Sequence, residues 1–372
     1  MKTAFFILVI LHGLIHVIGF VKGYELREIK EFTLPISKPM GIAWLITCLF
    51  FLGYGLLFSI SHRYAGIVGL AAVVLSQILI FLVWKDAKFG TLPNILILLV
   101  TLVSMGQFFF EKRVQEETDA LLSQVNPSPA QPITEDELRD LPEPVKKWLR
   151  RSGMVGRPRL TVGKVTQKAE MKLKPDQENW FPAKAVQYTR MDVPGFIWTV
   201  DVKMNPLVFF RGRDKFAEGQ GQMLILLEAL FPIVNASGEK LDEGSLQRYL
   251  GELVWFPSFA LSKDIIWEQL SDTSAKATLQ VRDTRGSGTF YFTPEGDFSR
   301  FSALRYQGNE ADAKRQEWVI QATQYQEMDG IRIPTQMTAT WKLDQGDWTW
   351  LKLQVTDIQY NEQALRDRKP AD

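Results

Sequence analysis

The sequence predicts a membrane segment of four α-helices followed by an α+β domain. The α+β domain is expected to be a large, curved antiparallel sheet, a half-barrel, with two helices. Apolar residues are concentrated in the first 110 of the 372 positions. From Arg159 onward they recur at every second position, as in a strand with one wet face. We therefore expect a membrane domain at 1–110, a helical extension and proline-rich linker at 111–133, and a half-barrel at 134–372.

Four apolar runs are long enough to cross a membrane, because a spanning helix needs about 20 apolar residues. They are Ala4–Val21, Gly41–Ile60, Tyr64–Trp84 and Leu92–Phe110. No small-residue cleavage site follows the first run, so it is interpreted as a retained helix and not a signal peptide. A lipid bilayer is therefore an expected partner.

The basic residues beside these runs predict an orientation. The face that holds the N-terminus carries Lys2, Arg63, Lys112 and Arg113. The opposite face carries a larger set of Lys and Arg, namely Lys22, Arg27, Lys30, Lys38, Lys85 and Lys88. Because cytoplasmic loops are enriched in positive charge, both termini and the β domain are expected on the non-cytoplasmic side.

Two histidines lie inside the first apolar run, in "LHGLIHVIGF". His12 and His16 are four residues apart and share one helix face. A polar group in hydrocarbon needs a partner inside the helix bundle. The polar residues expected near them are Gln77, Asp86, Lys88 and Asn94.

This polar cluster has three interpretations. It could be a hydrogen-bond network that fixes helix packing. It could be a metal or haem site, with Asp86 completing the ligands because no third His or Cys lies on that face. It could also be a proton relay or a pocket for a small polar ligand. We expect that this cluster binds neither a metal nor a cofactor.

Two helices are expected in and before the sheet region. Thr134 to Glu137 form a capping box that opens a helical stretch, and "LPEPVKKWLRRSG" continues it up to Gly153. "LDEGSLQRYLGELVWFP" is a second helix that interrupts the strands. About ten or eleven strands are expected, with hairpin turns at "RGSG", "PEGD", "MDG" and "DQGD". A sheet this long must close or curl, and the second helix can plug its concave side.

Missing residue types limit the chemistry of the β domain. Residues 111–372 contain no histidine and no cysteine. This excludes a Ser-His-Asp or Cys-His nucleophile and the usual zinc sites there. Hydrolysis by a pair of carboxylates is not excluded by the composition, but no spacing singles out a pair, so no catalytic residue is assigned. The net charge of +1 gives no reason to expect nucleic acid.

The segment "RYLGELVWFP" holds the candidate ligand-binding residues Arg248, Tyr249, Glu252 and Trp255. Arg248 and Glu252 are one helical turn apart, which fits an ordinary ion pair beside core aromatics. The alternative is that they form a polar group at the mouth of an apolar cavity, where this group binds the head of an amphiphilic ligand.

Several motifs resemble a bacterial family of unknown function that is often fused to a four-helix membrane segment. They are "DVPGFIW", "NASGEKLDEGSLQRYLGELVWFP" and "GIRIPTQMTATW", with "HGLIH..GF" and "W.DAKFGT..N" in the membrane segment. The resemblance implies a multi-pass protein of the bacterial inner membrane and brings no catalytic residues. The order strands, helix, strands is also similar to the half-barrels of lipoprotein carriers, by topology alone.

Three functions follow as hypotheses. The first is a membrane-tethered, non-catalytic binding protein for a lipid or other hydrophobic small molecule. The second is a membrane-embedded enzyme, or a redox or metal site, that uses His12 and His16 with the β domain as regulator. The third is a structural or sensing protein whose β domain binds a protein partner. They differ on whether the concave face is open or filled by its own side chains.

Overall fold

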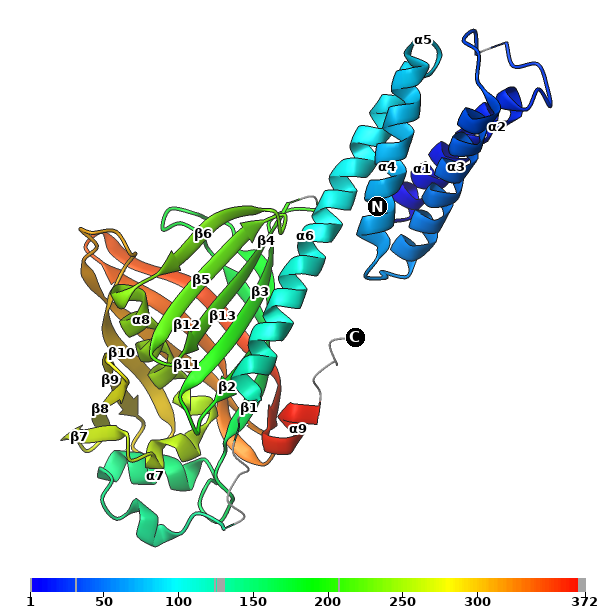
Figure 1. Ribbon diagram of the computed structural model, residues 1–372. Helices are drawn as coiled ribbons and strands as arrows, with labels where there is room; N and C mark the ends of the chain where they lie inside the picture. The colour runs from blue at the N-terminus through cyan, green and yellow to red at the C-terminus, as the bar shows by residue number, and fades with distance from the viewer. Residues whose placement is uncertain (1, 31, 124, 126–130, 207, 367–372) are drawn as a thin grey trace. The chain divides into compact units, whose positions relative to one another are not determined.

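The computed structural model describes residues 2–30, 32–123, 125, 131–206 and 208–366. The chain divides into two compact units, Met1–Glu111 and Lys112–Asp372. Figure 1 shows the first as a group of helices and the second as a strongly curved sheet with helices. Each unit is described by itself.

The first unit is helical. Its elements are α1 (Lys2–Ile15), α2 (Val17–Gly23), α3 (Lys38–Ser59), α4 (Ala65–Leu82), α5 (Trp84–Ala87), the 3₁₀ turn η1 (Lys88–Gly90) and the first part of α6 (Thr91–Leu122). Among the described residues, four helical stretches are long and apolar enough to cross a membrane: Lys2–Gly23, Lys38–Ser59, Ala65–Leu82 and Trp84–Leu122. The four predicted apolar helices are thereby confirmed.

Small residues let the helices of this unit approach closely. A Cβ on Gly69 would lie 2.7 Å from the ring of Tyr54, and one on Gly13 would lie 2.7 Å from Cβ of Phe51. Phe51 and Tyr54 are completely buried. Large apolar side chains such as Leu56 and Phe81 point outward and are more than 60% exposed. Small residues between helices and apolar residues outside are typical of helices that pack in lipid.

The second unit is built on one antiparallel sheet of thirteen strands. The strands are β1 (Val162–Met171), β2 (Phe181–Arg190), β3 (Gly195–Lys203), β4 (Phe209–Ala217), β5 (Gln220–Leu227), β6 (Phe231–Ser237), β7 (Ile265–Ser271), β8 (Ser274–Val281), β9 (Thr284–Phe292), β10 (Phe298–Tyr306), β11 (Arg315–Met328), β12 (Ile331–Leu343) and β13 (Gly346–Tyr360). Their order is β6-β5-β4-β3-β2-β1-β13-β12-β11-β10-β9-β8-β7. The predicted curved antiparallel sheet is confirmed.

The strand count exceeds the predicted ten or eleven. One reason is the run "MLILLEALFPIV", which looks like a single apolar strand but contains β5, a turn and β6. Glu228 and Ala229 form that turn with φ of 53° and 55°. Positive φ at both central residues is the geometry of a tight hairpin, which normally shows itself by Asn or Gly. Here the sequence gives no such signal.

One predicted turn was wrong. "RGSG" lies inside β9, and the turn is placed earlier, at Arg282, whose φ is 53°. The two glycines serve close packing: a Cβ on Gly288 would lie 2.1 Å from the ring of Phe301. Positive φ at Gly296, Gly330 and Gly346 confirms the turns in "PEGD", "MDG" and "DQGD".

The helices of the second unit are mostly short. They are the 3₁₀ turn η2 (Glu135–Leu138), α7 (Glu143–Arg151), α8 (Glu239–Gly251), the 3₁₀ turns η3 (Glu252–Trp255) and η4 (Pro257–Leu261), and α9 (Asn361–Arg366). The capping box at Thr134 and Glu137 is present but opens only four residues of 3₁₀ helix. The last turns of α6 also belong to this unit, where Leu121 and Leu122 pack with Val162 and Ile197.

The segment α8–η3–η4 fills part of the concave side of the sheet (Figure 1). α8 contacts β4, β5 and β6 at one end of the sheet and β8, β9 and β10 at the other. A Cβ on Gly221 of β5 would lie 2.8 Å from the carbonyl oxygen of Leu241, so glycine lets the helix lie against the strand. The β4–β5 turn and the start of β9 also meet directly, because Thr284 Oγ1 donates a 2.7 Å hydrogen bond to the carbonyl of Gly219.

Candidate functional site

The concave face is defined by contacts with α8. The guanidinium carbon of Arg248 lies 4.7 Å from the ring centre of Trp198 on β3. Trp198 pairs with Asp214 on β4, so both side chains are on the face toward α8. Because side chains alternate along a strand, every second residue from these positions shares that face.

A polar network joins α8 to this face. Arg248 donates to Glu252 (2.7 Å), to Asp214 (2.8 Å) and to Gln187 (2.9 Å). Gln187 in turn donates to Glu252 at 2.6 Å. Burial raises the pKa of Asp214, an effect that the Arg248 guanidinium opposes. The arginine predicted to hold a ligand is thus already held by two carboxylates and an amide.

Tyr249 and Trp255 attach the same segment to the sheet. The Tyr249 hydroxyl donates to the carbonyl of Arg190 at 2.9 Å, and the Trp255 indole donates to the carbonyl of Pro334 at 3.0 Å. Both side chains are at most 2% exposed. In this structure they fix the segment α8–η3–η4, which we call the plug, to the sheet. A direct ligand contact by these two residues stays a prediction.

Beyond the plug, the concave face is apolar, and several of its large side chains are only half-buried. One row across seven neighbouring strands is entirely apolar: Leu227, Phe210, Val202, Ala183, Ala169, Leu353 and Met337. A second row pairs Trp318 with Trp341 and Trp341 with Trp348. We use the name apolar concave surface for the half-buried members Phe181, Phe210, Ile225, Leu227, Trp341, Trp348 and Leu353.

In the membrane unit, His12, His16 and Asn94 lie in one buried network. Nδ1 of His16 is 2.8 Å from the carbonyl oxygen of His12, so this nitrogen carries the proton and Nε2 accepts from Ser76 at 2.8 Å. Asn94 donates to Ser76 at 2.9 Å, and its oxygen accepts from Nε2 of His12 at 2.8 Å. The hydrogen bonds form a closed ring in which each donor has an acceptor.

Gln77 extends this ring. Its side-chain oxygen accepts from Asn94 at 3.1 Å, and its amide nitrogen donates to Thr91 at 3.1 Å. The ring also interrupts the first helix: the backbone N–H of His16 donates to Gly13 because the His16 side chain occupies the carbonyl of His12. This is where α1 ends and α2 begins.

Two residues expected in this cluster lie elsewhere. Asp86 accepts hydrogen bonds from the backbone of Thr33 and Leu34 and from the Thr33 hydroxyl, at 2.7 to 2.8 Å. Lys88 is exposed, with its ammonium 5.3 Å from the ring centre of Phe89. Charged groups avoid the apolar interior when a polar loop can bind them. Within the described part of the chain, no three His, Cys, Asp or Glu residues are grouped to hold a metal ion.

Sequence reasoning missed Ser76 and Arg305. Ser76 is completely buried and completes the ring, but a serine in an apolar helix gives little signal. Arg305 lies two residues after Ala303 and four after Phe301, in phase with the apolar face of β10. A charged residue at an apolar position of a strand could have marked it.

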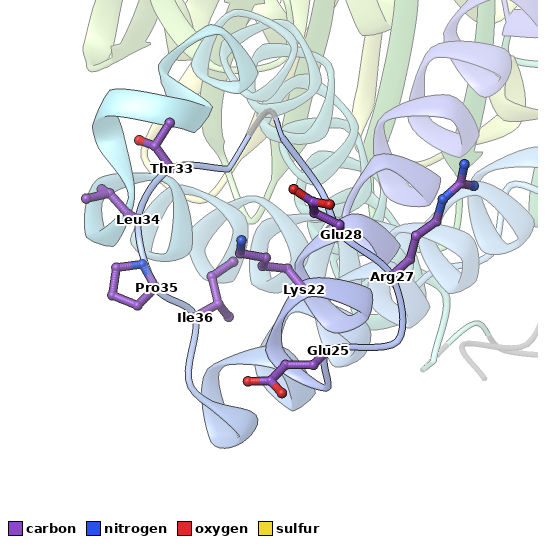
Figure 2. Close-up of a pocket in the computed structure, with 8 residues that line it drawn as sticks. All are labelled: Lys22, Glu25, Arg27, Glu28, Thr33, Leu34, Pro35 and Ile36. Atoms are coloured by element: carbon purple, nitrogen blue, oxygen red, sulfur yellow. The ribbon is translucent and has the colours of Figure 1, made fainter.

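A polar pocket of about 530 Å³ lies at the connection between α2 and α3. Figure 2 shows its lining, with Lys22, Glu25, Arg27 and Glu28 on one arm of the connection and residues 33–36 on the other. Glu25, Arg27 and Glu28 are exposed, so water can solvate their charges. This lining by itself defines no site.

Another pocket, of about 550 Å³, lies in the second unit, where the last turns of α6 face the β4–β5 and β8–β9 turns. Its lining includes Lys215, Glu218 and Arg282. Arg282 and Glu218 form an ion pair at 3.1 Å. The pocket is polar and differs in character from the apolar concave surface.

The fold and the site define a class of protein: a curved half-barrel with an internal helical plug, preceded by apolar helices. Residues 131–353 match a family of unknown function, DUF6544, and the chain belongs to this family. The predicted membership of a family of unknown function is confirmed. No curated protein matches the chain.

Two solved structures are similar in fold. The alignment with a LolA superfamily protein from Nitrosomonas europaea covers 56% of this chain and 90% of that protein, with 9% sequence identity and a TM-score of 0.34. The alignment with a β-barrel-like protein of the DUF1849 domain from Brucella abortus covers 55% of this chain and 99% of that protein, with 7% sequence identity and a TM-score of 0.26. Likenesses of this size say nothing about a ligand of this chain.

The ring around Asn94 predicts a stability effect. Replacing Asn94 with leucine keeps the number and branching of the side-chain heavy atoms but removes three hydrogen bonds of the ring. Each such bond contributes about 0.6 kcal/mol within a membrane protein, so unfolding in mixed micelles should become easier by about 2 kcal/mol. Leu96→Ala, at a 47% exposed position of the same helix, is the control and should change little. Equal stabilities of the two variants would contradict a structural ring.

Proposed function

We propose that this protein is a membrane-tethered, non-catalytic binding protein for a lipid or other hydrophobic small molecule. The observation that supports the proposal is the apolar concave surface, whose side chains are left half-buried beside the plug. Elsewhere on the concave face the plug covers its neighbours on the sheet almost completely: Phe196, Phe290 and Phe301 are at most 1% exposed. The two parts of the concave face thus differ in how far the plug covers them.

Half-buried aromatic side chains inside a curved sheet favour binding of an apolar molecule. A ligand that covers them removes apolar area from water at about 25 cal/mol per Å². Trp341, Trp348, Phe210 and Leu353 supply large areas of this kind. The residues around them have no imidazole or thiol, which supports binding and gives no support to nucleophilic catalysis.

The histidine ring supports a structural role for the membrane cluster. Both ring nitrogens of His16 already have hydrogen-bond partners, and Nε2 of His12 is bound to Asn94. Ligation of a metal through these atoms would break the ring. The intramembrane enzyme is therefore the less supported alternative, and a protein partner for the β domain has no specific observation in its favour.

A fluorescent fatty-acyl probe tests the proposal in detergent-solubilised full-length protein. The wild type should bind the probe, and lipid should co-purify and be seen by mass spectrometry. Phe210→Ser should weaken probe binding about five- to tenfold, because it removes part of the apolar concave surface. Phe209→Ser is the matched control: Phe209 is also half-buried but points to the opposite face of β4.

Absence of probe binding and of co-purified lipid in the wild type would overturn the proposal. Equal losses in the two variants would show that binding does not use the concave face.

We further propose a bacterial inner-membrane location with the β domain on the non-cytoplasmic side. The support is the distribution of Lys and Arg beside the four apolar helices. Protease added to intact spheroplasts should then degrade the β domain. Protection of the domain until the membrane is lysed would reverse the orientation.

A further inference from the structure

Arg305 lies inside the half-barrel against the ring of Trp318, with no carboxylate paired to it among the described residues. It lies on β10, and its half-buried side chain makes neither a hydrogen bond nor an ion pair with the described residues. Its Nε is completely shielded from solvent and has no acceptor. A buried hydrogen-bond donor without an acceptor costs free energy, so Nε of Arg305 requires an explanation.

The position of Arg305 on the concave face follows from its neighbours. A Cβ on Gly251 of α8 would lie 2.9 Å from Phe301, which places Phe301 on the face toward the plug. Arg305 is four residues along the same strand and shares this face. Gly244 of α8 lies over the guanidinium, since a Cβ there would be 3.2 Å from Nη2. The helix therefore leaves room for the group.

The guanidinium adjoins the apolar concave surface. Its carbon lies 4.2 Å from the ring centre of Trp318 and 5.7 Å from that of Trp341. Trp341 pairs directly with Trp348. A molecule that covers these tryptophans would therefore bring one end close to a cation.

The carboxylates in this region are already bound by other arginines. Arg248 holds Asp214 and Glu252, and Arg315 holds Glu243 through both of its terminal nitrogens at 2.5 and 2.6 Å. Burial, together with the positive charge of Arg248, lowers the pKa of Arg305 to about 9, although the carboxylates of Asp214, Glu252 and Glu243 act in the opposite direction. The positive charge is incompletely compensated.

Unused hydrogen-bond donors lie in the same row. The indole N–H groups of Trp318 and Trp348 have no acceptor among the described residues. Trp318 is only 3% exposed. A free guanidinium with neighbouring free donors favours a ligand that brings acceptor oxygens and negative charge.

We propose that the ligand is an anionic amphiphile whose carboxylate pairs with Arg305 while its chain covers the apolar concave surface. This inference rests on the proposed function and specifies the class of ligand. It differs from the sequence-based expectation, because Arg248 is satisfied within the protein and Arg305 is not.

Competition between two ligands tests the role of the charge. Full-length protein in detergent at pH 8 is loaded with a fluorescent acyl probe, which is displaced with stearate or with stearyl alcohol. The two competitors share one chain and differ in the head group. The ratio of the affinities for the two competitors is compared between variants, so that the difference in their partition into micelles cancels. The wild type should prefer stearate by about tenfold, the size of one charge-assisted hydrogen bond.

Variants at Arg305 assign this preference. Arg305→Met should bring the stearate-to-alcohol ratio close to one and leave alcohol binding unchanged, while Arg305→Lys should keep most of the preference. Arg300→Met is the matched control, since Arg300 lies on the same strand with its guanidinium 4.1 Å from the ring centre of Tyr291. It should behave as the wild type.

The outcomes separate the two proposals. Equal affinity of the wild type for both competitors, or an unchanged preference in Arg305→Met, would overturn the anionic ligand and leave hydrophobic binding intact. Failure of the probe to bind the wild type at all would overturn the proposed function itself.

Discussion

The packing of one helical segment against the concave face determines what the β domain can do. α8, η3 and η4 lie against the curved sheet and are anchored there by Arg248, Tyr249 and Trp255. Where this segment lies, the sheet has an ordinary protein core. Where it ends, side chains of the same apolar character stay half-buried. The plug thus supports the sheet and leaves part of its concave face uncovered.

Each unit contains a buried polar cluster whose members satisfy one another by hydrogen bonds within the protein. In the membrane unit, His12, His16, Ser76 and Asn94 exchange hydrogen bonds in a ring that needs no outside partner. In the β domain, Arg248 is satisfied in the same way by carboxylates and an amide. Arg305 departs from this pattern within the described residues, and it does so beside the uncovered apolar face. The missing acceptor for the buried Nε of Arg305 is the observation from which we infer an anionic ligand.

The length of the apolar runs was enough to predict the four apolar helices, and residue periodicity predicted the antiparallel sheet and the helix that interrupts it. Periodicity failed where local conformation depends on distant packing. The turn at Glu228 and Ala229 has no glycine or asparagine, and Gly288 serves contact with Phe301 instead of a turn. The candidate site was harder to predict, because an apolar residue in a strand gives the same sequence pattern whether another element covers it or leaves it accessible. Arg248 was noticed by its spacing to Glu252, whereas Arg305 depends on partners that the sequence cannot place.

The central claim is that the concave face has a filled part and an open part. Full-length protein labelled with fluorotryptophan, with resonances assigned by single Trp→Phe substitutions, can be titrated with a spin-labelled fatty acid. The account predicts that the signals of Trp341 and Trp348 broaden, while that of Trp255, which belongs to the plug and is 1% exposed, does not. Equal broadening of all three signals, or broadening of none, would contradict it.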